Sequence, residues 1–197
     1  MRGNRRRSIE FLVVRFYPGG LALNTRDAAW SLETKRLLLR RVVLDDAAFM
    51  LSIWNDPAFI RHVGDRGIRT VAEAETALKE GAFALYNEFG YGPYCMVLKD
   101  GGTLAGICGL FRRDYLEHPD IGFAVLPEFY RSGLTIEAAH AVVQHARNDL
   151  GIDYLTAIVS PDNVASISLI EKLGLTFDRG ITMPDEEKIS VYSIRLD

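Results

Sequence analysis

The chain has 197 residues, of which 48% are hydrophobic and 25% are charged, and its formal net charge is -3. This length suits one domain with a well-buried core and is short for two, and the composition is that of a globular protein. The acidic balance gives no general attraction to nucleic acid or to an anionic membrane, and no apolar run approaches the roughly 20 residues of a membrane span. We therefore expect neither nucleic acid nor a membrane among its partners.

The N-terminal stretch differs from the rest of the chain. Several arginines precede a short apolar run at residues 9–14, which Glu10 interrupts. That run is too short for the apolar core of a secretory signal, and no small-residue cleavage site follows it. We expect residues 1–30 to form a loosely ordered extension and residues 31–197 to form the single domain.

Apolar periodicity predicts the regular elements of this domain. Short apolar runs bounded by turn residues predict strands at 34–41, 94–98, 104–111, 121–126, 154–160 and 190–196. Helical spacing predicts helices at 44–54, about 70–89, 133–150 and 163–174. This order predicts an α/β fold in which helices pack on a mixed, mostly antiparallel sheet.

Capping residues support these boundaries. Asp56 and Pro57 end the first helix, and Thr70 with Glu73 forms a capping box at the start of the second. The last helix has Asn163 as its cap, and Gly174 stands where a left-handed stop is expected.

Ser166 heads the apolar stripe of the last helix, because it lies four residues before Ile170 and seven before Leu173. A hydroxyl at the inner end of such a stripe either bonds a backbone carbonyl of its own helix or has a chemical role. Spacing alone leaves both interpretations open.

The cysteine and histidine positions predict neither a disulfide framework nor a metal site. The two cysteines, Cys95 and Cys108, are too few for a disulfide framework and lack the spacing of a metal site. We expect both to be reduced core residues of a cytoplasmic protein. His140 and His145 are five residues apart and lie on different sides of the predicted helix, so no metal site is expected.

Five segments in chain order carry a resemblance to a known family: 32–40, 54–57, 121–128, the pair 137–138, and 163–174, where Asn163 and Ser166 precede Glu171-Lys172-Leu173-Gly174. Together with the order of elements, they resemble the GNAT acyl-CoA N-acyltransferases, and within them the RimJ/RimL-like branch. The resemblance covers residues 31–197. It implies a sheet of six to seven strands, splayed between the fourth and fifth strands and flanked by about four helices.

The resemblance also implies acetyl-CoA as co-substrate. The main chain of Phe123, Ala124 and Val125 would pair with the pantetheine arm and polarise the thioester carbonyl. Asn163 would bond the same arm, and the Ser166 hydroxyl would assist the departing thiolate.

The turn before the 133–150 helix is the candidate pyrophosphate site, since a helix N-terminus offers free amides and a positive dipole. Its cofactor-binding candidates are Arg131, Ser132, Gly133, Leu134 and Thr135. The family turn reads Q/R-x-x-G-x-G/A, whereas Tyr130 and Thr135 occupy its first and last positions here. Those two side chains could instead narrow the turn and weaken cofactor binding.

The base that deprotonates the amine is predicted among three residues near the acceptor side. Asp120 is the first candidate, and Glu117 and His118 are the alternatives, acting directly or through water. The resemblance implies direct transfer in a ternary complex, because Cys108 has no histidine partner for a covalent route.

The acceptor is predicted to be a primary amine, on a protein or peptide N-terminus or on a small molecule. Its pocket would lie between residues 45–90 and 112–120, and the protein would be a monomer or a homodimer. The alternative is a non-catalytic acyl-CoA-binding or interaction protein on the same fold, which the altered 130–135 turn favours.

Overall fold

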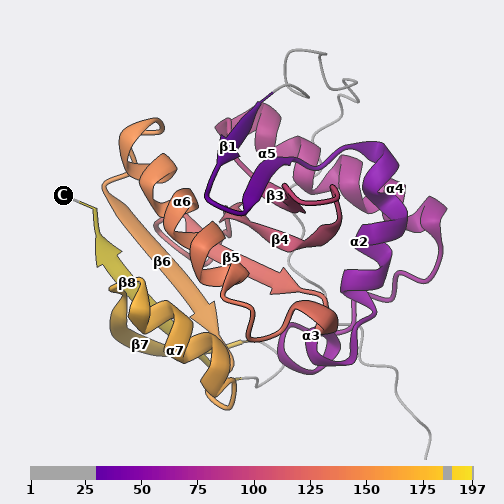
Figure 1. The fold of residues 1–197 in the computed structure, drawn as a ribbon. Helices are drawn as coiled ribbons and strands as arrows, with labels where there is room; N and C mark the ends of the chain where they lie inside the picture. The colour runs from indigo at the N-terminus through magenta and orange to yellow at the C-terminus, as the bar shows by residue number, and fades with distance from the viewer. Residues whose placement is uncertain (1–29, 184–187, 197) are drawn as a thin grey trace, which may run out of the picture.

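The computed structural model describes residues 30–183 and 188–196. Within them lies one sheet whose strand order is β1-β2-β3-β4-β5-β6-β8-β7 (Figure 1). The strands are β1 (Ser31–Glu33), β2 (Leu37–Arg41), β3 (Pro93–Leu98), β4 (Leu104–Phe111), β5 (Asp120–Val125), β6 (Tyr154–Val159), β7 (Thr176–Thr182) and β8 (Lys188–Arg195). All neighbouring pairs are antiparallel except β5 and β6, which run parallel. The predicted α/β fold with a mixed, mostly antiparallel sheet is therefore confirmed.

Helices pack on this sheet. They are α2 (Ala47–Trp54), α3 (Pro57–His62), α4 (Val71–Glu80), α5 (Ala82–Phe89), α6 (Leu134–Asn148) and α7 (Val164–Lys172), with short 3-10 turns η1 (Leu44–Asp46) and η2 (Pro127–Phe129). Figure 1 shows α6 and α7 on the same face of the sheet. This follows from chain geometry, because β5-α6-β6 and β6-α7-β7 are crossovers between parallel strands and both take the right-handed path.

Side-chain caps fix the starts of α3 and α4. Asp56, which was predicted only to end the preceding helix, also caps α3, because its carboxylate accepts the amides of Ala58 and Phe59. The Thr70 side chain accepts the Glu73 amide, which completes the predicted capping box of α4. None of the helices among the described residues is long and apolar enough to cross a membrane.

The structure differs from the sequence prediction in its strands, in its helices and at the boundary of the extension. Helix α3 was not predicted. The described sheet has eight strands rather than six or seven, because the short β1 pairs with β2 and the polar β7 pairs with β8. The helix predicted over 70–89 is two helices, since Gly81 has φ of -107° and ψ of -84°. Trp30 was assigned to the extension, but its ring centroid lies 4.5 Å from that of Tyr94. The rest of the predicted extension, residues 1–29, lies outside the described residues.

The parallel pair β5 and β6 meets at a single register position, Asp120 with Thr156. Thr156 N donates to Pro119 O at 2.9 Å and Thr156 Oγ1 donates to the same oxygen at 3.0 Å. Beyond that position the two strands no longer pair. We call residues 121–125 of β5 and 157–159 of β6 the fork, and it corresponds to the predicted splay.

Register and alternation decide which side chains face which helices. Tyr94 is opposite Cys108, Cys108 is opposite Phe123, and the Tyr94 ring lies 6.1 Å from that of His145 on α6. These side chains share the α6 face, because directly opposed residues point to the same side. Asp120 lies three positions before Phe123 on the same strand, and residues an odd number apart alternate in side, so Asp120 points to the opposite face.

Close backbone approach in the centre of the sheet requires glycine at position 109. A Cβ added there would lie 2.5 Å from Cα of Pro93, which is backbone and cannot rotate away. We expect Gly109→Ala to lower the free energy of unfolding by about 3 kcal/mol or more, as overpacking of a rigid core does. Urea denaturation measures this. Gly180→Ala on β7 is the control, because a Cβ there meets nothing within 4 Å, and equal effects of the two substitutions would contradict the packing argument.

Candidate functional site

The fork exposes main-chain groups of β5. Leu126 N donates to Ala105 O at 2.9 Å, so the alternate residues Ala124 and Gly122 also direct their main-chain groups toward β4. The N–H groups of Phe123 and Val125 consequently point to the other edge, where β6 has already separated. Of the three predicted binding residues on this strand, Phe123 and Val125 offer free amides to the fork, whereas the Ala124 amide is bound within the sheet.

The facing edge of β6 is open in the same way. Leu196 N donates to Asp153 O at 2.8 Å, so the odd-numbered residues of β6 bond β8 and Ile158 directs its N–H and C=O toward β5. Sequence reasoning missed Ile158, because its role depends on pairing register and its side chain is that of an ordinary core residue.

Each strand of the fork leads into a helix start. β5 ends at Val125 and α6 begins at Leu134, while β6 ends at Val159 and α7 begins at Val164. Because the carboxyl ends of parallel strands lie at the same edge of the sheet, both positive helix N-termini flank the fork. An anionic or electron-rich group placed between the strands is stabilised from both sides.

The turn into α6 is rigidly built. Gly133 has φ of 76° and Arg131 has φ of 59°, and the latter is the only non-glycine residue with positive φ among those described. Arg36 donates from Nη1 to Ser132 O at 2.9 Å and from Nε to Glu137 Oε2 at 2.6 Å. Burial raises the pKa of Glu137, but hydrogen bonds from Thr34 and Arg36 outweigh it and lower that pKa overall. Glu137 thus anchors the turn to the start of β2.

The predicted phosphate donors of this turn divide into two groups. Ser132 Oγ donates to Phe129 O at 2.6 Å and accepts the Leu134 amide at 3.3 Å, so these two residues bond within the turn. The amides of Arg131, Gly133, Thr135 and Ile136 have no acceptor among the described residues. These four free N–H groups and the exposed Arg131 side chain are what the turn can offer to an anion.

At the start of α7, Asn163 acts as the helix cap. Its Oδ1 accepts the Ser166 amide at 3.1 Å. The Ser166 hydroxyl is partly buried and has no hydrogen-bond partner among the described residues, in contrast to the helical Thr76, whose hydroxyl donates to Ala72 O at 3.1 Å. The structural role considered for Ser166, bonding a carbonyl of its own helix, is therefore not the one it adopts.

Helix α3 connects the two loops that leave the fork. Tyr130 Oη donates to Asp56 Oδ1 at 3.4 Å, and Arg61 Nη2 lies 3.3 Å from Asp162 Oδ2. Tyr130, which replaces the usual first residue of the family turn, thus connects that turn to the cap of α3. Tyr130 is 47% exposed.

Asp120 is buried at the start of the fork, with only 1% of its surface exposed. Oδ1 accepts from Arg113 Nε at 2.9 Å, and Oδ2 has no partner among the described residues. Burial raises the pKa of Asp120 above its ordinary value, and the charge of Arg113 opposes this. A carboxylate with an unfilled oxygen and a raised pKa has the properties of a proton acceptor.

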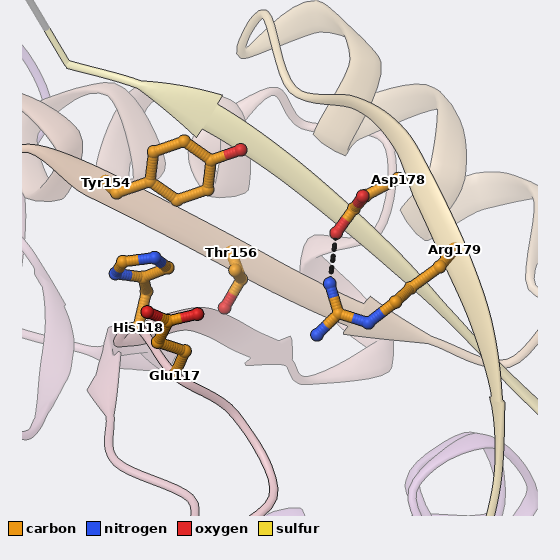
Figure 2. A pocket seen from close by; sticks show the side chains of 6 residues that line it. All are labelled: Glu117, His118, Tyr154, Thr156, Asp178 and Arg179. Atoms are coloured by element: carbon orange, nitrogen blue, oxygen red, sulfur yellow. Dashed lines mark hydrogen bonds and ion pairs between the residues drawn. The ribbon is translucent and has the colours of Figure 1, made fainter.

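Glu117 and His118, the alternative bases, lie beside Thr156, at the position where the fork begins. They line a polar cleft of about 240 Å³ together with Tyr154, Thr156, Asp178 and Arg179. Figure 2 shows Glu117 and His118 on the loop before β5, with Arg179 extending from β7 toward Thr156. Asp178 and Arg179 form an ion pair there. Thr156 borders both this cleft and Asp120, so the cleft adjoins the base candidate on the face away from α6.

The cysteines show no features of nucleophiles. Cys108 is fully buried, and burial raises the pKa of its thiol well above the ordinary value. Since the thiolate is the reactive form, Cys108 is inert in this environment. No group of three or more His, Cys, Asp or Glu side chains within residues 30–183 and 188–196 is arranged to hold a metal ion.

Comparison with known proteins agrees with this geometry. Residues 36–176 match the family model described as an acetyltransferase (GNAT) domain. The chain is 30% identical over 145 residues to the uncharacterized N-acetyltransferase YoaA of Bacillus subtilis (strain 168), covering 73% of this chain and 81% of YoaA.

Two solved structures share the fold. An acetyltransferase from Agrobacterium tumefaciens str. C58 has a TM-score of 0.72 at 24% identity, over 84% of this chain and 94% of that one. The ribosomal L7/L12 α-N-protein acetyltransferase RimL, solved with coenzyme A, has a TM-score of 0.73 at 14% identity, over 85% and 99%. The open parallel pair, the two helix starts beside it and the match over residues 36–176 lead to one conclusion: the chain belongs to the GNAT family of acetyltransferases.

Proposed function

We propose that this protein moves an acetyl group from acetyl-CoA to a primary amine by direct transfer in a ternary complex. Family membership makes it an acetyl-CoA-dependent acetyltransferase, so the non-catalytic alternative is not retained. The fork carries the proposal, because it presents free main-chain N–H groups from β5 beside two helix N-termini.

Two parts of acetyl-CoA have separate binding places, the pantetheine arm at the fork and the pyrophosphate at the turn before α6. The pantetheine arm adds to the open edge of β5, where the Phe123 and Val125 amides donate to it or to the thioester oxygen, and Ala124 forms the surface between them. The pyrophosphate accepts from the free amides of Gly133 and Thr135 and pairs with Arg131, while Ser132 and Leu134 hold the turn in shape. Asn163 keeps its side-chain Nδ2 available to the arm while its Oδ1 caps α7.

The chemical step then needs two proton-handling groups. The acceptor nitrogen forms a bond to the thioester carbon, its proton passes to Asp120 directly or through water, and the carbon–sulfur bond breaks with the electron pair remaining on sulfur. The Ser166 hydroxyl, which has no other partner among the described residues, donates a hydrogen bond to the departing thiolate.

The acceptor is proposed to be a primary amine on a protein N-terminus or on a small molecule. The fold shared with RimL, a ribosomal L7/L12 α-N-protein acetyltransferase, supports considering the RimJ/RimL-like branch. A cytoplasmic location and a monomeric or homodimeric state stay predictions from the sequence.

Titration calorimetry with acetyl-CoA, with CoA and with a pantetheine analogue lacking the phosphates tests this proposal. We expect micromolar binding of acetyl-CoA and a loss of about 100-fold or more for the analogue, because several charge-assisted hydrogen bonds at the α6 turn are removed. Failure of acetyl-CoA to bind below about millimolar would contradict the proposal, since cellular concentrations could not fill such a site.

A further inference from the structure

Arg66 has no counter-charge in the part of the chain that the structure describes. It lies between α3 and α4, and its guanidinium carbon is 4.3 Å from the ring centroid of the buried Trp54. It has no hydrogen bond or ion pair among the described residues. The adjacent Asp65 is occupied, because its carboxylate binds Arg69 Nη2 at 2.5 Å and the Gly67 amide at 2.9 Å.

A second arginine lies nearby on the other side of the predicted acceptor region. Arg113 binds Asp120 Oδ1 at 2.9 Å, and its guanidinium carbon is 5.7 Å from the Phe111 ring centroid. The pKa of Arg66 is lowered, first by desolvation and second by the positive charge of Arg113. Arg66, which is exposed, and Arg113 are therefore close enough for their charges to repel, and each guanidinium lies over its own aromatic ring, Trp54 or Phe111.

Arg113 and Phe111 adjoin the fork. A Cβ added to Gly122 would lie 2.8 Å from Cε2 of Phe111, so the Phe111 ring covers β5 between Asp120 and Phe123. Asp120 and Phe111 are also opposed in the β4–β5 register and share the face away from α6. An amine that approaches the thioester from this face passes the arginine pair.

The charges of Arg66, Arg113 and Asp120 do not cancel. The two arginines contribute two positive charges and Asp120 contributes one negative charge when ionised, so these three groups together carry one positive charge. A guanidinium stacked on an aromatic ring keeps its in-plane N–H fork free for a carboxylate. A polyamine, by contrast, would be repelled by the same pair.

We propose that Arg66, assisted by Arg113, binds a carboxylate of the acceptor, and that the acceptor is a small amine carrying a carboxylate, that is, an amino acid. The shared role of Arg113 supports a small acceptor. Arg113 would help to bind the carboxylate of the acceptor and also binds Asp120, so one small molecule could reach both. This inference rests on the proposed function, which it narrows from primary amines in general to carboxylate-bearing ones.

Binding of reaction products tests the inference without needing turnover. With CoA present, N-acetyl derivatives of the protein amino acids are titrated in pairs, each free acid against its carboxamide. We expect at least one free acid to bind about 10- to 100-fold more tightly than its carboxamide, the usual range for a charge-assisted hydrogen bond. Arg66→Gln should remove that difference while acetyl-CoA binds as before.

Arg69→Gln is the matched control, because it removes the same charge from the same loop and Arg69 lies on no aromatic ring. It should leave the free-acid preference intact. Turnover then distinguishes the possible acceptors. Free amino acids should be acetylated faster than peptides with acidic N-terminal residues, and spermidine should be a poor acceptor.

Equal binding of free acids and carboxamides, absence of any binding, or an Arg66→Gln effect equal on both forms would overturn the inference. So would preferred turnover of spermidine or of peptides, and these outcomes leave the proposed acetyl transfer intact. Failure of acetyl-CoA itself to bind would instead count against the proposed function.

Discussion

Replacing Ser166 by alanine is expected to lower kcat about 100-fold on the true acceptor, within the usual range for proton assistance to a leaving group. The hydroxyl is partly buried and has no hydrogen-bond partner among the described residues, so its removal leaves no protein group unsatisfied. The affinity for acetyl-CoA should stay within about threefold, because the Ser166 amide that Asn163 caps is retained. Steady-state kinetics with calorimetry of acetyl-CoA measures both quantities.

Ser168→Ala is the control for this substitution. Ser168 lies on the same helix and is exposed, so its loss should alter neither kcat nor binding. Unchanged turnover in Ser166→Ala would show that the hydroxyl has no chemical role. A weakened affinity with unchanged kcat would instead assign Ser166 to cofactor binding.

The second large effect is expected at Asp120. Asp120→Asn should lower kcat about 100-fold, because an amide cannot accept the proton of the attacking amine. In the native protein, activity should fall as the pH drops through the pKa of Asp120, which burial raises above the ordinary carboxyl value. Asp120→Asn should lack this acidic limb, and pH–rate profiles of kcat measure the difference.

The ion pair with Arg113 requires its own control, since Asp120→Asn also leaves a largely buried guanidinium without its partner. Arg113→Gln breaks the same pair but retains the carboxylate. If Asp120 is the base, Arg113→Gln should raise KM for the acceptor and retain most of kcat together with the acidic limb. An equal loss of kcat in both variants would indicate that the pair only holds the structure.

At Asp120, stability and activity are expected to change with pH in opposite directions. The folded-state pKa of Asp120 is raised, so ionising the buried carboxyl costs folding free energy as the pH rises through the unfolded and then the folded pKa. Activity changes in the opposite direction, since the ionised form is the base. A pH–rate limb that merely followed stability would therefore have the wrong sign.

Local chemistry made several parts of the structure predictable. The capping box of Thr70 and Glu73 and the Asn163 cap both form between residues three positions apart. Their energies depend on the chain nearby and little on the rest of the fold. The helix over 70–89 was predicted wrongly as one element, because helical spacing of apolar residues continues across Gly81 although its backbone does not.

The placement of the site residues depended on contacts between distant segments. Register divides the β5 residues, so that Phe123 and Val125 face the fork and Ala124 does not. The roles of Ile158 and Arg66 had no signal in the sequence, since one depends on pairing between β6 and β8 and the other on the approach of two loops. Resemblance to the family suggested the location of the fork but not which hydroxyls or amides remain free there.

The sequence by itself determined the class of fold, the helix starts at residues 134 and 164, and the presence of Ser166 and Asp120 near the ends of their elements. These follow from periodicity and capping, which act over a few residues. Only the tertiary structure decided that β5 and β6 pair at one position and then separate, and that Ser132 bonds within its own turn. It also decided that Arg66 has no counter-charge within residues 30–183 and 188–196. The physical reason is that pairing register, burial and charge balance are properties of segments tens of residues apart, which become defined only when the core packs.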